Sequence, residues 1–487
     1  MVEIFMITFR NTLSYLITGV FLGLLIISRN LSVSLAFAIG LPLLIGAFLS
    51  LDFGVALLMT IVILFKRDQL FSVSLPLFGG GLKPTDMLFL SIMSGWLMRT
   101  GFSRKRLIGH SDAIPLFIFL LLFVIWAVCC AAIGLINGHF YKYSILELRP
   151  LVYYLLAIPI ISEFDINKVK RIIHIIIIAS TVISIKALIY YQLGIGEPAT
   201  YTGNDIRIMS VEFSYILFSF LLCICLYIET NKHILFGPLV ITLIGLVTTF
   251  QRSAFVGLAV GVLAIIIIAK HYSTIFTLFV FLFMACVFTY GYMNMSTEPT
   301  GMFQALTDRL VSISSYRSDL SAQHRFQEWK AAIKDIELHP VIGNGLGYVI
   351  TFYSPMYSPD EHKYGFLSEN IYVHNSYVWV CLKMGIIGVI LFLSMILAFM
   401  KYGWMSIGVY RNRSGYGYVL GLVTSVVSLS VVSFFGPMFN VDNVSPFVGF
   451  AFGAVAVSLA QLTEGKAERA RTLSGGFINN AEGHSTA

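Results

Sequence analysis

Apolar stretches long enough to cross a membrane recur along almost the whole chain. A helix needs about 20 apolar residues to span a hydrocarbon core about 30 Å thick, and it satisfies its own backbone hydrogen bonds there. The candidate spans lie near 12–28, 31–49, 51–65, 84–99, 114–134, 148–162, 172–193, 210–228, 234–249, 253–269, 272–290, 374–399, 416–436 and 446–462. Because several are short, we predict an all-α polytopic membrane protein with twelve to fourteen transmembrane helices.

The composition leaves little room for a separate soluble domain. Only 12% of the residues are charged and 57% are hydrophobic, whereas a soluble domain has about 25% charged residues. We therefore predict one integral membrane domain over 1–487, surrounded by membrane lipids, with a cytoplasmic, disordered tail at 463–487. The basic residues behind the net charge of +7 are scattered among the connections, so we expect no nucleic-acid partner.

The distribution of basic residues predicts the orientation. If the N-terminus is cytoplasmic, the connections and tails on that side carry roughly twice as many Lys and Arg residues as the other side, which is the positive-inside pattern. Lys66 and Arg67 fall on the other side and weaken the prediction for the third and fourth spans. The long polar connection 291–373 then faces outward, and a connection of this length usually carries function.

This loop contains a predicted helix near 320–338 and a glycine-rich turn. Apolar residues recur there at helical spacing, namely Phe326, Trp329, Ile333 and Ile336. Such an amphipathic helix can lie on the membrane face or cap the bundle. The turn "GNGLG" follows, and its Gly343 and Gly345 favour a tight turn over an anion-binding nest.

Arginines at span ends facing outward are candidates for binding an anion. We single out Arg207 in "NDIRIMS", Arg252 in "TTFQRSAFVGL" and Arg325 in the loop helix. Each could instead be an interfacial arginine that reaches toward lipid headgroups. Arg252 is the stronger candidate, because Gly257 and the glycine four residues later allow close helix packing and so indicate a protein crevice rather than lipid.

His374 stands where the polar loop becomes a long apolar helix. The nearby Glu369, Tyr372 and Asn375 make this a polar cluster at the outer membrane plane. A neutral imidazole there, with cations close enough to disfavour its protonation, would be a general base near neutral pH. We expect Asn375 and Glu369 to orient it. A hydrogen bond to a loop carbonyl is the simpler alternative.

Several motifs are absent. The sequence has no HExxH, no P-loop, no GxSxG and no acidic pair of metal-ligand spacing, and its six cysteines show neither a zinc nor a disulfide pattern. We therefore expect no cofactor and no metal, and we expect arginine, whose planar fork matches phosphate oxygens, to bind any anion.

Three segments together resemble the O-antigen ligase and O-antigen polymerase superfamily: "FQRSAFVGLAVG", "HRFQEWKAAIKDIELHPVIGNGLG" and "VHNSYVWVCLKMGIIGVI". The resemblance covers roughly 200–400 and rests on the combination of degenerate pieces: an arginine, an outward loop with Arg-x-x-x-Trp and a glycine turn, then His-Asn opening a span. It implies a metal-independent glycosyltransferase of the bacterial inner membrane that uses a glycan carried on undecaprenyl diphosphate.

The resemblance also assigns roles to residues of this chain. It places the diphosphate-binding arginines at Arg252 and Arg325, with Arg207 a weaker match, and the catalytic histidine at His374. The acceptor would be lipid A-core for a ligase, which we favour narrowly, or another lipid-linked glycan for a polymerase. Direct displacement by an acceptor hydroxyl would invert the anomeric centre. The active site would face the periplasm, with the loop helix folded back so that the two arginines and the histidine converge.

A flippase or other transporter of lipid-linked oligosaccharides is the alternative from another class. Transporters place charged residues midway through the bilayer, whereas the polar residues here concentrate toward the outer face, and only Lys186 and Lys383 lie clearly inside predicted spans. That asymmetry favours chemistry on a lipid headgroup.

Overall fold

The computed structural model describes residues 31–65, 83–103, 114–193, 197–198, 206–207, 213–249, 251–272, 320–358 and 363–460. Four predicted regions lie outside these residues: the span 12–28, the span 272–290 apart from Tyr272, the first part of the loop (291–319) and the tail 463–487.

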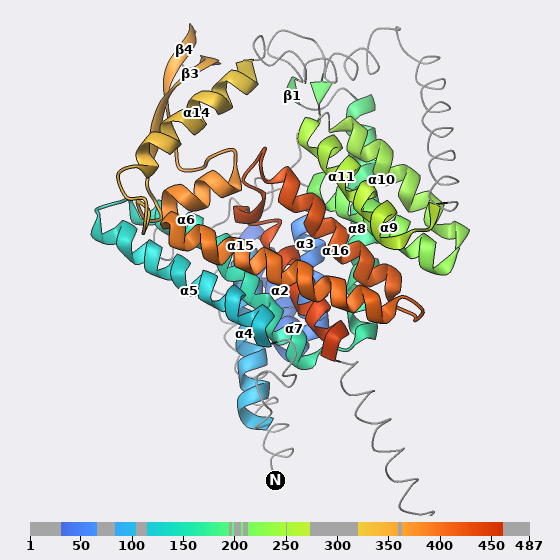
Figure 1. Cartoon of the computed structure of the whole chain (residues 1–487). Coiled ribbons are helices and arrows are strands. Elements are labelled where there is room, and N and C mark those ends of the chain that lie inside the picture. Colours follow the sequence, from blue (N-terminus) through green and yellow to red (C-terminus); the bar gives the residue numbers. More distant parts are fainter. Residues whose placement is uncertain are drawn as a thin grey trace, which may run out of the picture.

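The described part of the chain is dominated by a bundle of apolar helices (Figure 1). They are α2 (Leu31–Leu49), α3 (Leu51–Leu64), α4 (Pro84–Ser103), α5 (Ile114–Ile136), α6 (Tyr141–Val152), α7 (Ala157–Glu163), α8 (Ile166–Gln192), α9 (Phe213–Thr230), α10 (Phe236–Thr248), α11 (Arg252–Ala269), α15 (Ser376–Tyr410), α16 (Tyr416–Val432) and a last helix, Ser445–Ala460. The short 3-10 helices η3 (Tyr153–Leu156), η4 (His233–Leu235) and η5 (Met438–Asn440) join them.

Six of the described helical segments are long and apolar enough to cross a membrane. They are 115–136, 141–163, 166–190, 213–230, 252–269 and 376–410, and five further apolar helices are shorter. Segment 141–163 contains α6, η3 and α7, so it begins seven residues before the predicted span 148–162. The prediction of an all-α polytopic membrane protein is confirmed.

Close packing at the centre of the bundle depends on small residues. A Cβ on Gly417 of α16 would lie 2.4 Å from the carbonyl oxygen of Cys225 in α9, and one on Gly421 would lie 2.6 Å from Leu222. Glycine therefore lets α16 and α9 approach closely. Gly257 of α11 is packed against Val432 and Ser428 of α16 in the same way, as its GxxxG spacing predicted.

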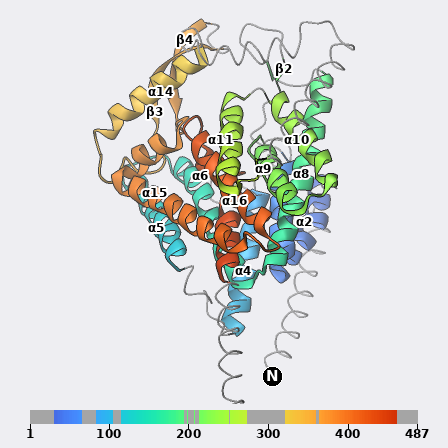
Figure 2. The same cartoon turned by 45° about the vertical axis from the view of Figure 1, so that its right-hand side comes forward.

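The loop elements stand at one end of the bundle, where α14 (Leu320–Ile336) lies beside a hairpin of β3 (Ile350–Ser358) and β4 (Lys363–Asn370) (Figures 1 and 2). The helix was predicted and the hairpin was not. A smaller antiparallel pair joins β1 (Glu197–Pro198) to β2 (Ile206–Arg207). The predicted apolar stripe of α14 does not face inward as a whole, because Phe326 is 63% and Ile333 53% exposed, while Glu328 and Ala332 are fully buried.

Helix α15 is broken at Gly385, whose φ of 65° and ψ of −168° are not helical. Figure 2 shows its two stretches running in different directions. The predicted span 374–399 is therefore a short helix, 376–384, followed by a longer one, 386–410. Four backbone hydrogen bonds bridge the break. The N–H groups of Asn344 and Gly345, in the glycine-rich turn, donate to Leu382 (2.9 Å) and Lys383 (3.0 Å), and the N–H groups of Ile386 and Ile387 donate to Pro340 (2.9 Å) and Val341 (3.4 Å), just before the turn. The peptide groups freed by the break are thus paired within the protein, as a membrane setting requires.

Candidate active site

His374 lies in the short connection between β4 and α15, next to the loop helix α14. Its side chain is 39% exposed, while the preceding Val373 is fully buried. The backbone is thus fixed and the imidazole is accessible. His374 thus lies where the loop meets the helix, as its place in the sequence predicted, and its reactivity stays a prediction.

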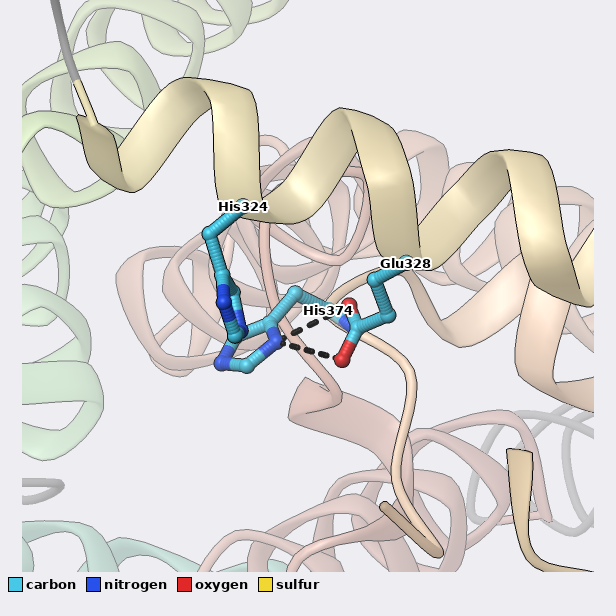
Figure 3. Close-up of side chains that lie close together, drawn as sticks. All are labelled: His324, Glu328 and His374. Atoms are coloured by element: carbon cyan, nitrogen blue, oxygen red, sulfur yellow. Dashed lines mark hydrogen bonds and ion pairs between the residues drawn. The ribbon is translucent and has the colours of Figure 1, made fainter. Parts of the chain in front are cut away.

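The carboxylate of Glu328, on α14, holds this imidazole (Figure 3). His374 Nδ1 lies 3.1 Å from Glu328 Oε1 and 3.0 Å from Oε2, and the backbone N–H of His374 donates to Oε2 at 2.7 Å. The side-chain amide of Asn370, at the end of β4, donates to Oε1 at 3.2 Å. Glu328 itself is fully buried, so its position is set by three donors and by packing.

This arrangement selects one tautomer of the histidine. A carboxylate is a hydrogen-bond acceptor, so Nδ1 carries the hydrogen that points toward Glu328, and Nε2 keeps its lone pair. A carboxylate beside the ring also favours the positive charge that the ring gains when Nε2 accepts a proton, the role of the acidic member in a catalytic triad. The pair can therefore act as an oriented general base.

A second histidine, His324, lies one helical turn before Glu328 on the same face of α14. Its Nδ1 is 2.8 Å from Ser354 Oγ of β3, and its ring centroid is 6.1 Å from that of His374. Burial lowers the pKa of His324 below its ordinary value, Glu328 opposes this, and His374 and Arg325 add to the lowering. His324, Glu328 and His374 bring ligand atoms within 4.8 Å of one another, so these three could hold a metal ion.

The residues predicted to orient His374 have other positions. Asn375 is the N-cap of α15, and its Oδ1 accepts hydrogen bonds from the backbone N–H groups of Tyr377 (2.9 Å) and Val378 (3.2 Å). Glu369 is an exposed residue of β4, paired in register with Thr351. Glu328 takes the orienting position instead, because α14 packs across the start of α15.

The glycine-rich turn is a structural joint rather than the predicted anion nest. Its amides are already engaged: Asn344 and Gly345 donate to α15, and Gly343 donates to the carbonyl of His339 at 2.9 Å. The φ angles of Gly343 and Gly345 are 78° and 86°, which favour glycine. A Cβ on Gly345 would lie 2.5 Å from the backbone N of Gly134 in α5. Both glycines are required for the turn to enter between α5 and α15.

A buried ion pair also stabilises the contact between the glycine-rich turn and α15. Lys383 and Glu147 are both fully buried, with Nζ 2.8 Å from Glu147 Oε1. Glu147 also accepts from the indole N–H of Trp379 at 2.9 Å and from the backbone N–H of Gly347 at 2.6 Å, and Lys383 donates to the carbonyl of Tyr348. The lysine inside the predicted span is thus satisfied by structural partners, as buried charges require.

The three predicted arginines lie on different elements. Arg325 is next to His324 on α14, and Arg252 is the half-buried first residue of α11. Arg207 belongs to β2, opposite Glu197, and only its backbone is described.

Contacts with α16 show where Arg252, at the start of α11, lies relative to the start of α15. Ser428 Oγ donates to the carbonyl of Gly257 in α11 at 2.7 Å, and the backbone N–H of Ser376 donates to the carbonyl of Ser433, the C-cap of α16, at 2.8 Å. The start of α11 and the start of α15 therefore lie at the same end of α16. Convergence of both arginines and His374 on one diphosphate stays a prediction.

The remaining predicted residues surround the histidine pair. Trp329 follows Glu328 on α14 and packs against the core, and Tyr372 is half-buried two residues before His374. Sequence reasoning missed Glu328 itself. The sequence signal for it is the spacing from His324, since residues four apart on a helix share one face.

Comparison with known proteins identifies the part of the chain that holds this site. Residues 237–393 match the family model described as O-antigen ligase, and the matched segment includes Arg252, Arg325, Glu328 and His374. No curated protein matches the chain. The segment 237–393, which contains His324, Glu328, His374 and the glycine-rich turn, is therefore similar to the O-antigen ligase family.

Proposed function

We propose that this protein transfers a glycan from undecaprenyl diphosphate to an acceptor hydroxyl, with His374 as the general base. The family match supports a ligase- or polymerase-like glycan transfer. The observation that carries the proposal is the buried Glu328 carboxylate against His374 Nδ1 at 3.0 Å, because it leaves Nε2 oriented to accept a proton. Lipid A-core is our first choice of acceptor, and a second lipid-linked glycan, for a polymerase, is the alternative.

The proposed reaction is a single displacement. The acceptor oxygen forms a bond to the anomeric carbon as the bond from that carbon to the diphosphate oxygen breaks, and the acceptor proton passes to Nε2 of His374. The glycan already carries its leaving group, so no nucleotide is needed, and the anomeric centre inverts. In the proposal Arg252 and Arg325, with Arg207, bind the diphosphate and stabilise the charge that grows on it.

The proposed location is the inner membrane, with the site at the periplasmic face. The loop elements α14, β3 and β4 lie at one end of a bundle of membrane helices (Figure 1), His374 contacts α14 there, and the bias of basic residues favours that end as the outer one. Whether the gene product acts as a ligase or a polymerase is tested by deleting the gene, which as a ligase leaves the glycan on its lipid carrier and as a polymerase shortens it to one repeat.

The test of His374 separates binding from transfer on one purified variant. His374→Ala should lose about a hundred- to ten-thousand-fold in turnover, the usual share of general acid-base catalysis, and should still bind the lipid-linked donor, whose diphosphate the arginines hold. If His374→Ala instead loses donor binding and keeps the transfer rate per bound complex, the histidine is a phosphate ligand and another group accepts the proton.

A further inference from the structure

The histidine pair and Glu328 have the composition and spacing of a transition-metal site. His324 and Glu328 share one face of α14, and His374 approaches them from the connection before α15 (Figure 3). Their ligand atoms lie within 4.8 Å of one another, and the two imidazole rings meet edge to face at 78°. Secondary structure on both sides fixes the three backbones.

Both imidazoles are already oriented as metal ligands usually are. A metal-bound histidine almost always uses its second ring nitrogen to contact a carboxylate, a carbonyl or another polar group, which fixes the ring. Here Nδ1 of His324 meets Ser354 Oγ at 2.8 Å, and Nδ1 of His374 meets the Glu328 carboxylate. Within the described residues no hydrogen bond reaches Nε2 of either ring. Nε2 of His374 therefore keeps its lone pair for an ion, and Nε2 of His324 has one in the tautomer whose Nδ1 donates to Ser354.

We propose that this cluster binds one Zn²⁺ ion through Nε2 of His324 and Nε2 of His374, while Glu328 keeps its contact with Nδ1 of His374 and orients that ring. Zinc prefers nitrogen and carboxylate ligands in tetrahedral geometry, whereas Mg²⁺ and Ca²⁺ prefer all-oxygen sites. Tetrahedral Zn–N bonds of about 2.0–2.1 Å place ligand atoms about 3.3 Å apart. Side-chain rotation of the two histidines completes the site, and water takes the remaining positions.

Zinc binding opposes the proposed transfer reaction. The ion occupies the lone pair of His374 Nε2 that the acceptor proton needs, so zinc is a reversible inhibitor and not a cofactor. This consequence rests on the proposed function, while binding itself does not. The rate of transfer should therefore fall as the free zinc concentration rises, although zinc takes no part in the reaction.

Binding is tested on the full chain, purified in detergent without a polyhistidine tag. Co²⁺ is the probe, because its visible absorption reports tetrahedral nitrogen and oxygen ligands, and Zn²⁺ should displace it at one ion per chain. His324→Gln should weaken binding by more than about a hundredfold, since loss of even an outer-shell partner costs 10–100-fold. His339→Gln, at an exposed histidine beyond the end of α14, is the matched control and should bind normally.

Inhibition is measured for each variant relative to its own metal-free rate. Zn²⁺ should inhibit wild type and His339→Gln at the concentration at which it displaces Co²⁺, EDTA should reverse the inhibition, and His324→Gln should need far more zinc. Equal Co²⁺ binding by wild type and His324→Gln would overturn the site.

Two further measurements separate the possible failures. If His324→Gln does not fold, X-ray absorption of zinc-loaded wild type decides, because fewer than two imidazole ligands contradict the proposal. Normal binding without any transfer activity would leave the metal site standing and contradict the proposed function.

Discussion

Replacing Glu328 by glutamine tests whether the buried carboxylate sets the state of His374. The carboxylate accepts from the His374 backbone at 2.7 Å, from its Nδ1 at 3.0 Å and from Asn370 at 3.2 Å. Glutamine has one acceptor oxygen and one NH₂ donor. If the oxygen keeps the short backbone hydrogen bond at the Oε2 position, the NH₂ group takes the Oε1 position, 3.1 Å from Nδ1. A donor then replaces one of the two acceptors at Nδ1 and the negative charge is lost, so we expect the ring to place its hydrogen on Nε2.

The expected loss follows from that tautomer change. With hydrogen on Nε2, the imidazole cannot accept the acceptor proton, and the equivalent acid-to-amide change in a serine protease triad costs about 10⁴-fold in turnover, or about 5.5 kcal/mol of transition-state stabilisation. The donor hydrogen of Asn370 also loses its acceptor, which costs about 1–3 kcal/mol of stability. We therefore expect Glu328→Gln to fold and bind the lipid-linked donor, with turnover reduced by about 10³- to 10⁴-fold.

The assay is single-turnover transfer from purified lipid-linked donor, with donor binding measured separately. Glu369→Gln is the matched control, because Glu369 is an exposed carboxylate five residues before His374 on β4 and should retain the wild-type rate. Turnover of folded Glu328→Gln within threefold of wild type would refute the reasoning, because the carboxylate would then be only a packing element.

Three further outcomes are expected. Arg252→Ala and Arg325→Ala should each reduce transfer about a hundred- to thousand-fold, and Lys at either position should restore only part of it because it lacks a bidentate fork; near-normal transfer by folded Arg252→Ala would make it a headgroup anchor. Transfer should continue in excess EDTA, and loss of activity restored by magnesium or manganese would contradict an arginine-based mechanism. Gly345→Ala should lower the unfolding temperature in detergent, because its Cβ would lie 2.5 Å from the backbone of Gly134 at a φ of 86°, whereas Gly101→Ala on α4, with open space around it, should not.

The helical bundle was predictable because apolar length alone decides which segments can cross a membrane. The break in α15 was not, since "KMGIIG" continues the apolar pattern on both sides of Gly385. What makes the break stable is a set of hydrogen bonds to residues about 40 positions earlier, and a local pattern carries no information about such partners. The hairpin was missed for a related reason, because Pro355 and a bulge between Ser354 and Tyr357 interrupt its alternation.

The candidate site was partly predictable. His374 was identified from its place at a polar-to-apolar boundary, and that position requires only local sequence. Its partner Glu328 lies 46 residues earlier, so the pairing depends on how α14 turns about its axis. The apolar stripe left open whether α14 lies on the membrane face or caps the bundle, and in the structure Trp329 and Ile336 pack against the core while Phe326 and Ile333 are exposed. The observed rotation buries the Glu328 carboxylate against three donors.

The joint between the glycine-rich turn and the broken helix α15 limits which segments of this protein can be exchanged with those of a relative. Residues 340–347 supply hydrogen-bond partners to α15, to Cys130 in α5 and to Glu147 in α6. A chimera that receives only the outer loop of a relative would therefore place foreign backbone against all three helices and leave buried peptide groups unpaired. A graft of the hairpin alone, residues 350–370, would leave the joint intact, because its two ends meet in register at Ile350 and Asn370. Such a graft must keep Ser354 and Asn370, since these contact His324 and Glu328.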